Sequence, residues 1–109
     1  MRKVVAVYRY EVKPGRMKDF LAKLQVAASA KFVSPVMPSG GRLLRSTTPG
    51  PDTNGVTLFL EYNDMAAFGA RNAWEQANPE WRGLFAATPD SPERLLSVEV
   101  LTEIPLDGE

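Results

Sequence analysis

The order in which hydrophobic periodicities follow one another is the feature that most limits the fold of this chain. Residues 3–12 alternate with period two, which is typical of a strand, and residues 16–30 carry apolar side chains at helical spacing. Strand patterns over 42–48 and 55–63 follow, then helical patterns over 64–77 and 79–86, and a last strand pattern over 94–103. The sequence therefore predicts the order β-α-β-β-α-β, with a short extra helix.

This order is typical of an α+β domain with the split βαβ arrangement, in which both helices cover one face of a four-stranded antiparallel sheet. Right-handed crossovers place strand 3–12 in the centre, between strands 55–63 and 94–103. A chain of 109 residues suits one domain, so we expect residues 1–109 to form a single unit. Residues 48–55 are predicted to form a long turn, and Asp64 and Asn78 to cap helices, with Pro79 in the first turn of the second.

Alternation also predicts which side chains face the helices. Strand positions of one parity are expected to pack under them: Val4, Ala6, Tyr8, Tyr10, Val56, Leu58, Leu60, Tyr62, Leu96, Val98 and Val100. The opposite parity carries large apolar groups mixed with charges, namely Val5, Val7, Leu43, Phe59, Leu95 and Leu101 with Arg9, Glu11, Arg45, Glu61 and Glu99.

A monomer in water rarely leaves so many large apolar groups on open sheet. Burying them against a second copy removes them from water, at roughly 25 cal/mol per Å². We therefore expect a homodimer in which two sheets face each other, with Arg9 paired to Glu61 or Glu99 on a neighbouring strand.

Composition removes several classes of function. Lys and Arg total 13, as do Asp and Glu, so the chain lacks the basic excess of a nucleic-acid binder. It has no cysteine and no histidine, which excludes disulfides, zinc–thiolate sites and iron–sulfur clusters and removes the commonest general base. No carboxylate spacing matches an established cation-binding loop. We therefore expect neither a cofactor nor a metal ion.

The apolar run behind the basic N-terminal residues is short. Charges at Arg9 and Glu11 interrupt it, so it is predicted to be a strand and not a signal peptide. No apolar stretch approaches the length that spans a bilayer. We expect no membrane association and a cytoplasmic location.

Three short motifs resemble those of the dimeric α+β barrel superfamily. They are the strand–Lys13-Pro14-Gly15-Arg16–helix opening, the Glu61-Tyr62-Asn63-Asp64-Met65-Ala66-Ala67-Phe68 junction, and Ala77-Asn78-Pro79-Glu80-Trp81, which is similar to a signature of NIPSNAP-like members. The resemblance implies a ferredoxin-like subunit, dimerisation through the sheets, and a pocket between sheet and helices.

The superfamily includes cofactor-independent quinone-forming monooxygenases, haem-degrading monooxygenases and muconolactone isomerases. Haem-degrading members use a histidine ligand, which this chain lacks. Quinone-forming members surround an aromatic substrate with asparagine, tryptophan and tyrosine. The chain supplies these residue types, without a position-by-position match, at Asn72, Trp74, Trp81, Tyr8, Tyr10 and Tyr62.

The candidate catalytic residues are Asn72, Trp74, Trp81 and Tyr62. In this interpretation tryptophan stacks on a flat substrate and asparagine binds its oxygen. The alternative is that these aromatic residues anchor the helix to the sheet, the commoner role of buried rings.

Two hypotheses follow. The first is a cofactor-independent monooxygenase or isomerase acting on a small hydrophobic or aromatic molecule. The second is a non-catalytic dimer that binds a small ligand or a partner, with a role in stress or metabolism. A pocket with polar groups converging on it would favour the first, and a solid core the second.

Overall fold

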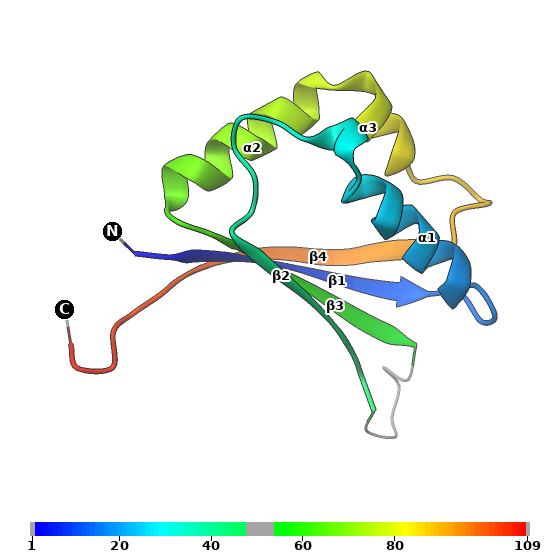
Figure 1. Ribbon diagram of the computed structural model, residues 1–109. Coiled ribbons are helices and arrows are strands. Elements are labelled where there is room, and N and C mark those ends of the chain that lie inside the picture. The colour runs from blue at the N-terminus through cyan, green and yellow to red at the C-terminus, as the bar shows by residue number, and fades with distance from the viewer. Residues whose placement is uncertain (1, 48–53, 109) are drawn as a thin grey trace.

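A computed structural model describes residues 2–47 and 54–108 and contains the predicted elements in the predicted order (Figure 1). The elements are β1 (Val4–Val12), α1 (Met17–Ala27), a 3-10 turn η1 (Ala30–Phe32), β2 (Gly40–Arg45), β3 (Gly55–Tyr62), α2 (Met65–Ala77), α3 (Pro79–Leu84) and β4 (Glu93–Thr102). The helix predicted over 16–30 ends earlier, at Ala27, and η1 begins at Ala30. Most of the turn predicted over 48–55 lies outside the described residues.

The four strands form one antiparallel sheet in the order β2-β3-β1-β4, and the helices lie on one face of it (Figure 1). This confirms the ferredoxin-like α+β prediction, with β1 in the centre between β3 and β4. The central strand is covered on both faces, since Ala6 and Val7 have opposite parity and both have no exposed surface.

A register shift in β4 corrects one part of the predicted alternation. Arg9 lies opposite Ser97 but Tyr10 lies opposite Leu95, so one extra residue of β4 is inserted between these pairs. Leu95 therefore lines the helix-side cavity, and Leu96 lines a hollow on the opposite face. The prediction for these two leucines is wrong because strict period two admits no bulge.

In strand β2, too, one leucine lies on the other face of the sheet from the one predicted. Leu43 lies opposite Leu58 and packs against the core that Tyr10 and Phe20 form beneath α1. The expectation that Leu43 faces away from the helices is therefore wrong. Below, "outer face" means the sheet face turned away from the helices.

The buried core is divided into two small clusters at opposite ends of β1. One lies beneath α1, where the rings of Tyr10 and Phe20 are 5.0 Å apart. The other lies at the start of α2, where Tyr62 packs edge-on against Phe68 with centroids 5.4 Å apart. Tyr8 contacts both clusters from the middle of the strand. The space above the middle of the sheet is therefore not filled by core side chains.

Both predicted N-caps are confirmed. The carboxylate of Asp64 accepts a hydrogen bond from the Ala67 amide at 2.8 Å and begins α2. The Asn78 side chain accepts from the amides of Glu80 and Trp81, at 3.0 and 3.1 Å, and begins α3. No helix among the described residues is both long enough and apolar enough to cross a membrane.

Candidate functional site

A large cavity, open to solvent, lies between the helices and the sheet, with a volume of about 1220 Å³. Its floor comes from the sheet and its walls from α1, α2, α3 and the segment before β2. Most of the lining is apolar, and the main apolar residues are Tyr8, Tyr10, Leu21, Leu24, Leu43, Leu58, Leu60, Phe68, Trp81, Phe85, Leu95 and Val98. Leu95 and Val98 of β4 are each 50% exposed, so the cavity is open to solvent over this strand. Such a concave apolar surface is typical of a small-molecule site.

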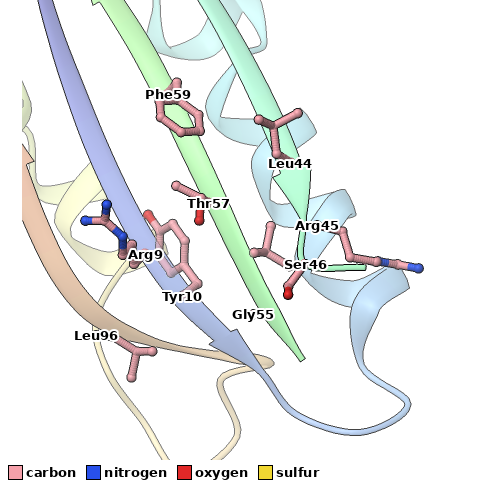
Figure 2. Close-up of a pocket in the computed structure, with 10 residues that line it drawn as sticks. Arg9, Tyr10, Leu44, Arg45, Ser46, Gly55, Thr57, Phe59 and Leu96 are labelled. Carbon is pink, nitrogen blue, oxygen red and sulfur yellow. The ribbon is translucent and has the colours of Figure 1, made fainter. Parts of the chain in front are cut away.

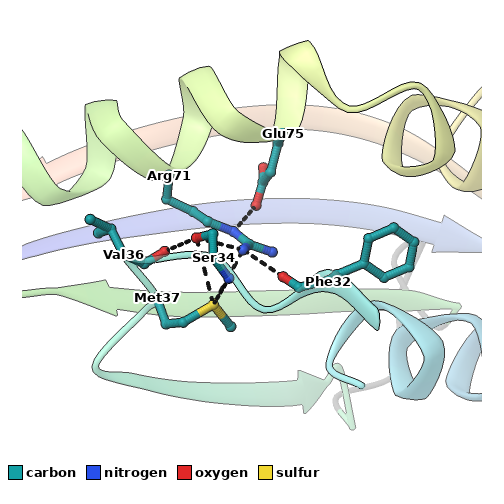
Figure 3. Close-up of polar contacts among 6 residues, drawn as sticks. All are labelled: Phe32, Ser34, Val36, Met37, Arg71 and Glu75. Carbon is teal, nitrogen blue, oxygen red and sulfur yellow. Dashed lines mark hydrogen bonds and ion pairs between the residues drawn. The ribbon is translucent and has the colours of Figure 1, made fainter. Parts of the chain in front are cut away.

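A buried arginine is the main polar group of the cavity wall. Arg71 extends from α2 and is only 2% exposed (Figure 3). Its Nη1 donates to the Phe32 carbonyl at 2.7 Å, to the Ser34 hydroxyl at 3.0 Å and to the Met37 sulfur at 3.2 Å. Ser34 in turn donates its hydroxyl proton to the Val36 carbonyl. The segment between η1 and β2 is therefore tied to α2 through one guanidinium.

Two tryptophan rings further restrict this guanidinium. Its carbon lies 4.4 Å from the ring centroid of Trp74 and 5.0 Å from that of Trp81. Cation–π contacts of this kind stabilise a desolvated cation by about 0.5–2 kcal/mol. Arg71 is thus held in one orientation by hydrogen bonds, an ion pair and stacking.

Glu75, one turn further along α2, supplies the acidic partner. Its Oε2 accepts from the Nε of Arg71 at 2.8 Å, and its side chain is 12% exposed. Burial raises the pKa of Glu75 above its ordinary value, although the hydrogen bond and the charge of Arg71 act in the opposite direction. A carboxyl with a raised pKa beside an apolar cavity is a candidate proton acceptor.

Three tyrosines of the sheet lie within the electrostatic reach of this carboxylate. Burial raises the pKa of Tyr8 to about 12, and the Glu75 charge adds to the effect. The pKa values of Tyr10 and Tyr62 are raised for the same first reason. At neutral pH these phenols are protonated, so Tyr8 and Tyr10, which line the cavity, can act as hydrogen-bond donors but not as bases.

An aromatic row closes the end of the cavity near α3. Trp81 contacts Phe32 and Phe85, with centroid distances of 5.2 and 4.9 Å. Beside Phe85, Lys23 of α1 pairs with Glu93 of β4 at 2.8 Å, and both side chains are nearly buried. This ion pair links α1 to β4. Within residues 2–47 and 54–108, no three acidic side chains gather as a metal site would require.

The structure brings two of the four predicted site residues to the cavity. Asn72 and Trp81 line it, whereas Trp74 lies against the guanidinium of Arg71, and Tyr62 is buried against Phe68. Nothing tests a catalytic role for any of them, and all four stay predictions.

Sequence reasoning missed Arg71 and Glu75. Both fall at helical spacing from Phe68, at the third and seventh positions after it, on the face that packs toward the sheet. A charged pair four residues apart within an apolar stripe is the signal that would have identified them.

The outer face carries a shallower hollow of about 260 Å³ (Figure 2). Arg9, Leu44, Phe59 and Leu96 line it from four different strands. Arg9 pairs with Glu99 at 3.9 Å, which is one of the two predicted partners, while Glu61 pairs with Lys3 at 3.0 Å. The apolar side chains on this face include Leu44, Leu96 and Leu101, which are 46%, 51% and 45% exposed.

Comparisons with known proteins identify the fold. The chain matches no protein-family model, and no curated protein is significantly similar to it. A dimeric ferredoxin-like protein from an uncultured marine organism has a TM-score of 0.69 and 15% identity, with 96% of this chain and 98% of the other covered.

Two further solved structures have names that describe a family or an activity. An uncharacterised NIPSNAP domain protein from Burkholderia xenovorans has a TM-score of 0.63 and 19% identity, over 94% of this chain and 93% of the other. SnoaB, a cofactor-independent oxygenase from Streptomyces nogalater, has a TM-score of 0.60 and 18% identity, over 96% and 94%. The predicted resemblance is thus confirmed at the level of structure: the chain has the ferredoxin-like α+β fold that NIPSNAP proteins share with cofactor-independent oxygenases of the SnoaB type.

Proposed function

We propose that this protein binds a small aromatic or otherwise apolar molecule between its sheet and helices and acts on it without a cofactor, as a monooxygenase or an isomerase. The observation that carries the proposal is the cavity itself, whose apolar walls converge on one buried polar pair, Arg71 and Glu75. SnoaB, with the same fold, is described as a cofactor-independent oxygenase, which supports the first reaction.

Each side chain at the cavity has a role that suits its chemistry. Trp81 offers a ring face for stacking, and Asn72 offers an amide that binds a substrate oxygen. Glu75 accepts a proton from an activated C–H group, since burial moves its pKa toward neutrality. Tyr8 remains protonated and donates a hydrogen bond to the oxygen on which negative charge develops.

The monooxygenase reaction balances without an external reductant when the substrate supplies the electrons. A methylene group of an electron-rich ring system, as in an anthrone, loses a proton to Glu75, and the resulting carbanion reacts with dioxygen. One oxygen atom becomes the new ketone, and the other leaves as water together with both methylene hydrogens. In the isomerase alternative the proton returns from Glu75 to a different carbon.

Turnover of an anthrone in buffer containing a chelator, measured as oxygen consumption and quinone formation, tests this function. Glu75→Gln is expected to lower kcat about 100-fold or more, because a general base contributes at least that much. Glu80→Gln is the matched control, since Glu80 is an exposed residue of α3 paired with Lys31. Equal turnover in wild type and Glu75→Gln would contradict the role of the carboxylate.

The second candidate function is non-catalytic binding in the same cavity. It is favoured if the protein binds aromatic molecules but turns over neither anthrones nor unsaturated lactones. Trp81→Phe and Asn72→Ala then weaken binding without a change in any rate.

We also propose that two copies associate through their outer faces. Half-exposed Leu44, Leu96 and Leu101 support this, as does the dimeric state of the marine ferredoxin-like protein. A cytoplasmic location also stays a prediction.

A further inference from the structure

We propose that the molecule bound in the cavity is a hydrophobic acid whose carboxylate binds the Nη2 group of Arg71. The inference rests on the proposed function, because it names the class of molecule that the same cavity takes. The observation behind the inference is that Nη2 of the buried Arg71 guanidinium donates no hydrogen bond to the described residues.

The hydrogen bonds of Arg71 leave one of its nitrogens without a partner among the described residues. Nε donates to Glu75, and Nη1 is shared among three acceptors from residues 32–37. No hydrogen bond from Nη2 to any residue in 2–47 or 54–108 is present, although this nitrogen carries two protons. No polar side-chain atom within those ranges is both fully buried and unpaired, so Nη2 has accessible surface. Because Arg71 is 2% exposed and lines the cavity, that surface belongs to the cavity.

A charged donor in such a place favours an anionic acceptor. Hydrogen bonds between a guanidinium and a carboxylate are roughly twice as strong as neutral ones, and surrounding apolar groups strengthen them further. The two carboxylates of the lining are already paired, Glu75 with Arg71 and Glu93 with Lys23. The lining also includes the cations Lys13, Arg42 and Arg94. Arg94 pairs with Glu11 at 3.2 Å, and with Glu11 counted the positive charges around the cavity still outnumber the negative ones.

The apolar floor of the cavity indicates the chemistry of the rest of the bound molecule. From Arg71 the apolar floor extends over Tyr8, Leu58 and Leu60 of the inner strands to Leu95 and Val98 of β4. Half-exposed leucine and valine side chains of this floor would be covered by an apolar body. A compact aromatic or aliphatic acid combines such a body with one terminal carboxylate.

Naphthoate and its methyl ester form a matched pair of probes that differ in charge. The neutral dye N-phenylnaphthylamine first reports whether the cavity binds apolar molecules at all. Displacement of this dye at neutral pH then gives the affinities of the acid and of the ester. We expect the acid to bind wild type at least about tenfold more tightly than the ester.

Substitutions at Arg71 assign that preference to one residue. Arg71→Met is expected to remove the tenfold preference while the affinities of the dye and the ester change less than about threefold. Arg71→Lys keeps the charge but not the placed second nitrogen, and we expect it to lose most of the preference. Arg42→Met, which removes another cation from the same lining, should keep it.

The outcomes separate the two proposals. If the dye does not bind, the proposed function fails and this inference fails with it. If the dye binds but acid and ester displace it equally, only the inference fails. It also fails if Arg42→Met and Arg71→Met reduce the preference equally, since the effect is then general positive potential. Should Arg71→Met not unfold cooperatively, the wild-type comparison of acid with ester and the Arg71→Lys variant still decide.

Discussion

Two opposing effects act on the pKa of Glu75, the acidic partner of Arg71. Burial penalises the carboxylate of Glu75, whereas the guanidinium at 2.8 Å favours it, and the net result is a raised pKa. A group whose pKa is higher in the folded than in the unfolded state makes its full contribution to stability at pH values below its unfolded-state pKa. That contribution is lost as the pH rises through the folded value.

Glu75→Gln tests whether stability falls or rises as Glu75 becomes ionised. The ordinary pKa of the group is 4.5. From that pH upward, the free energy of unfolding of wild type is expected to fall relative to that of Glu75→Gln, and the difference should level off above the raised pKa. Urea unfolding of both proteins at a series of pH values measures this difference. A wild type that gains stability over Glu75→Gln as the pH rises would mean that Arg71 outweighs burial.

At this scale the sequence could identify residue types but not their contacts. Asn72 and Trp81 were predicted from their chemistry, and both line the cavity. Arg71 was missed although it is adjacent to Asn72, because its three Nη1 acceptors lie more than thirty residues away along the chain. Periodicity places a side chain on a face, but only the folded chain brings residues 32–37 to it.

Individual elements were predictable wherever a local signal sets them. Asp64 and Asn78 were both identified as caps, since a short polar side chain before an apolar run has a local reason to be there. The bulge opposite Arg9 and Tyr10 was not predicted, because both Leu95 and Leu96 suit either face of the strand. Apolar residues on both faces remove the alternation that would reveal a shift of one position.

The Asn78 cap affects the cavity through α3, because one of the two amides that Asn78 binds is that of Trp81. Asn78→Ala is expected to lower the free energy of unfolding by about 1 kcal/mol. It should also weaken binding of N-phenylnaphthylamine, since α3 holds the Trp81 ring in the cavity wall. Chemical denaturation and dye titration measure the two effects.

Asn78→Asp and Asn63→Ala are the controls for this cap. Asn78→Asp keeps an acceptor oxygen and should restore both stability and dye binding. Asn63→Ala removes an exposed amide just before α2 that makes no side-chain hydrogen bond within the described part of the chain, so it should leave both close to wild type. Full dye binding by an Asn78→Ala protein of lowered stability would separate the cap from the cavity.

The whole molecule exposes apolar surface on both faces of its sheet, and the two faces differ in shape. The helix side is hollow and carries the buried polar pair, as a ligand site does, whereas the outer face is shallow and bordered by exposed ion pairs. Alternation in the sequence predicted that the outer face would be apolar, and element order predicted the fold. The depth of the cavity could not be predicted, because it depends on how far the helices stand from the sheet.

A charge placed on the outer face tests the proposed dimer. In light scattering, wild type is expected to have twice the 12.0 kDa mass of one chain. Leu96→Glu is expected to have the mass of one chain, because the symmetric contact would bring two carboxylates into a desolvated patch. Val26→Glu is the matched control, since Val26 is a 43% exposed residue of α1 that lines neither hollow. It should keep the mass of two chains. A wild type with the mass of one chain at high concentration, or a Leu96→Glu protein that stays at twice that mass, would show that the outer face is not the contact.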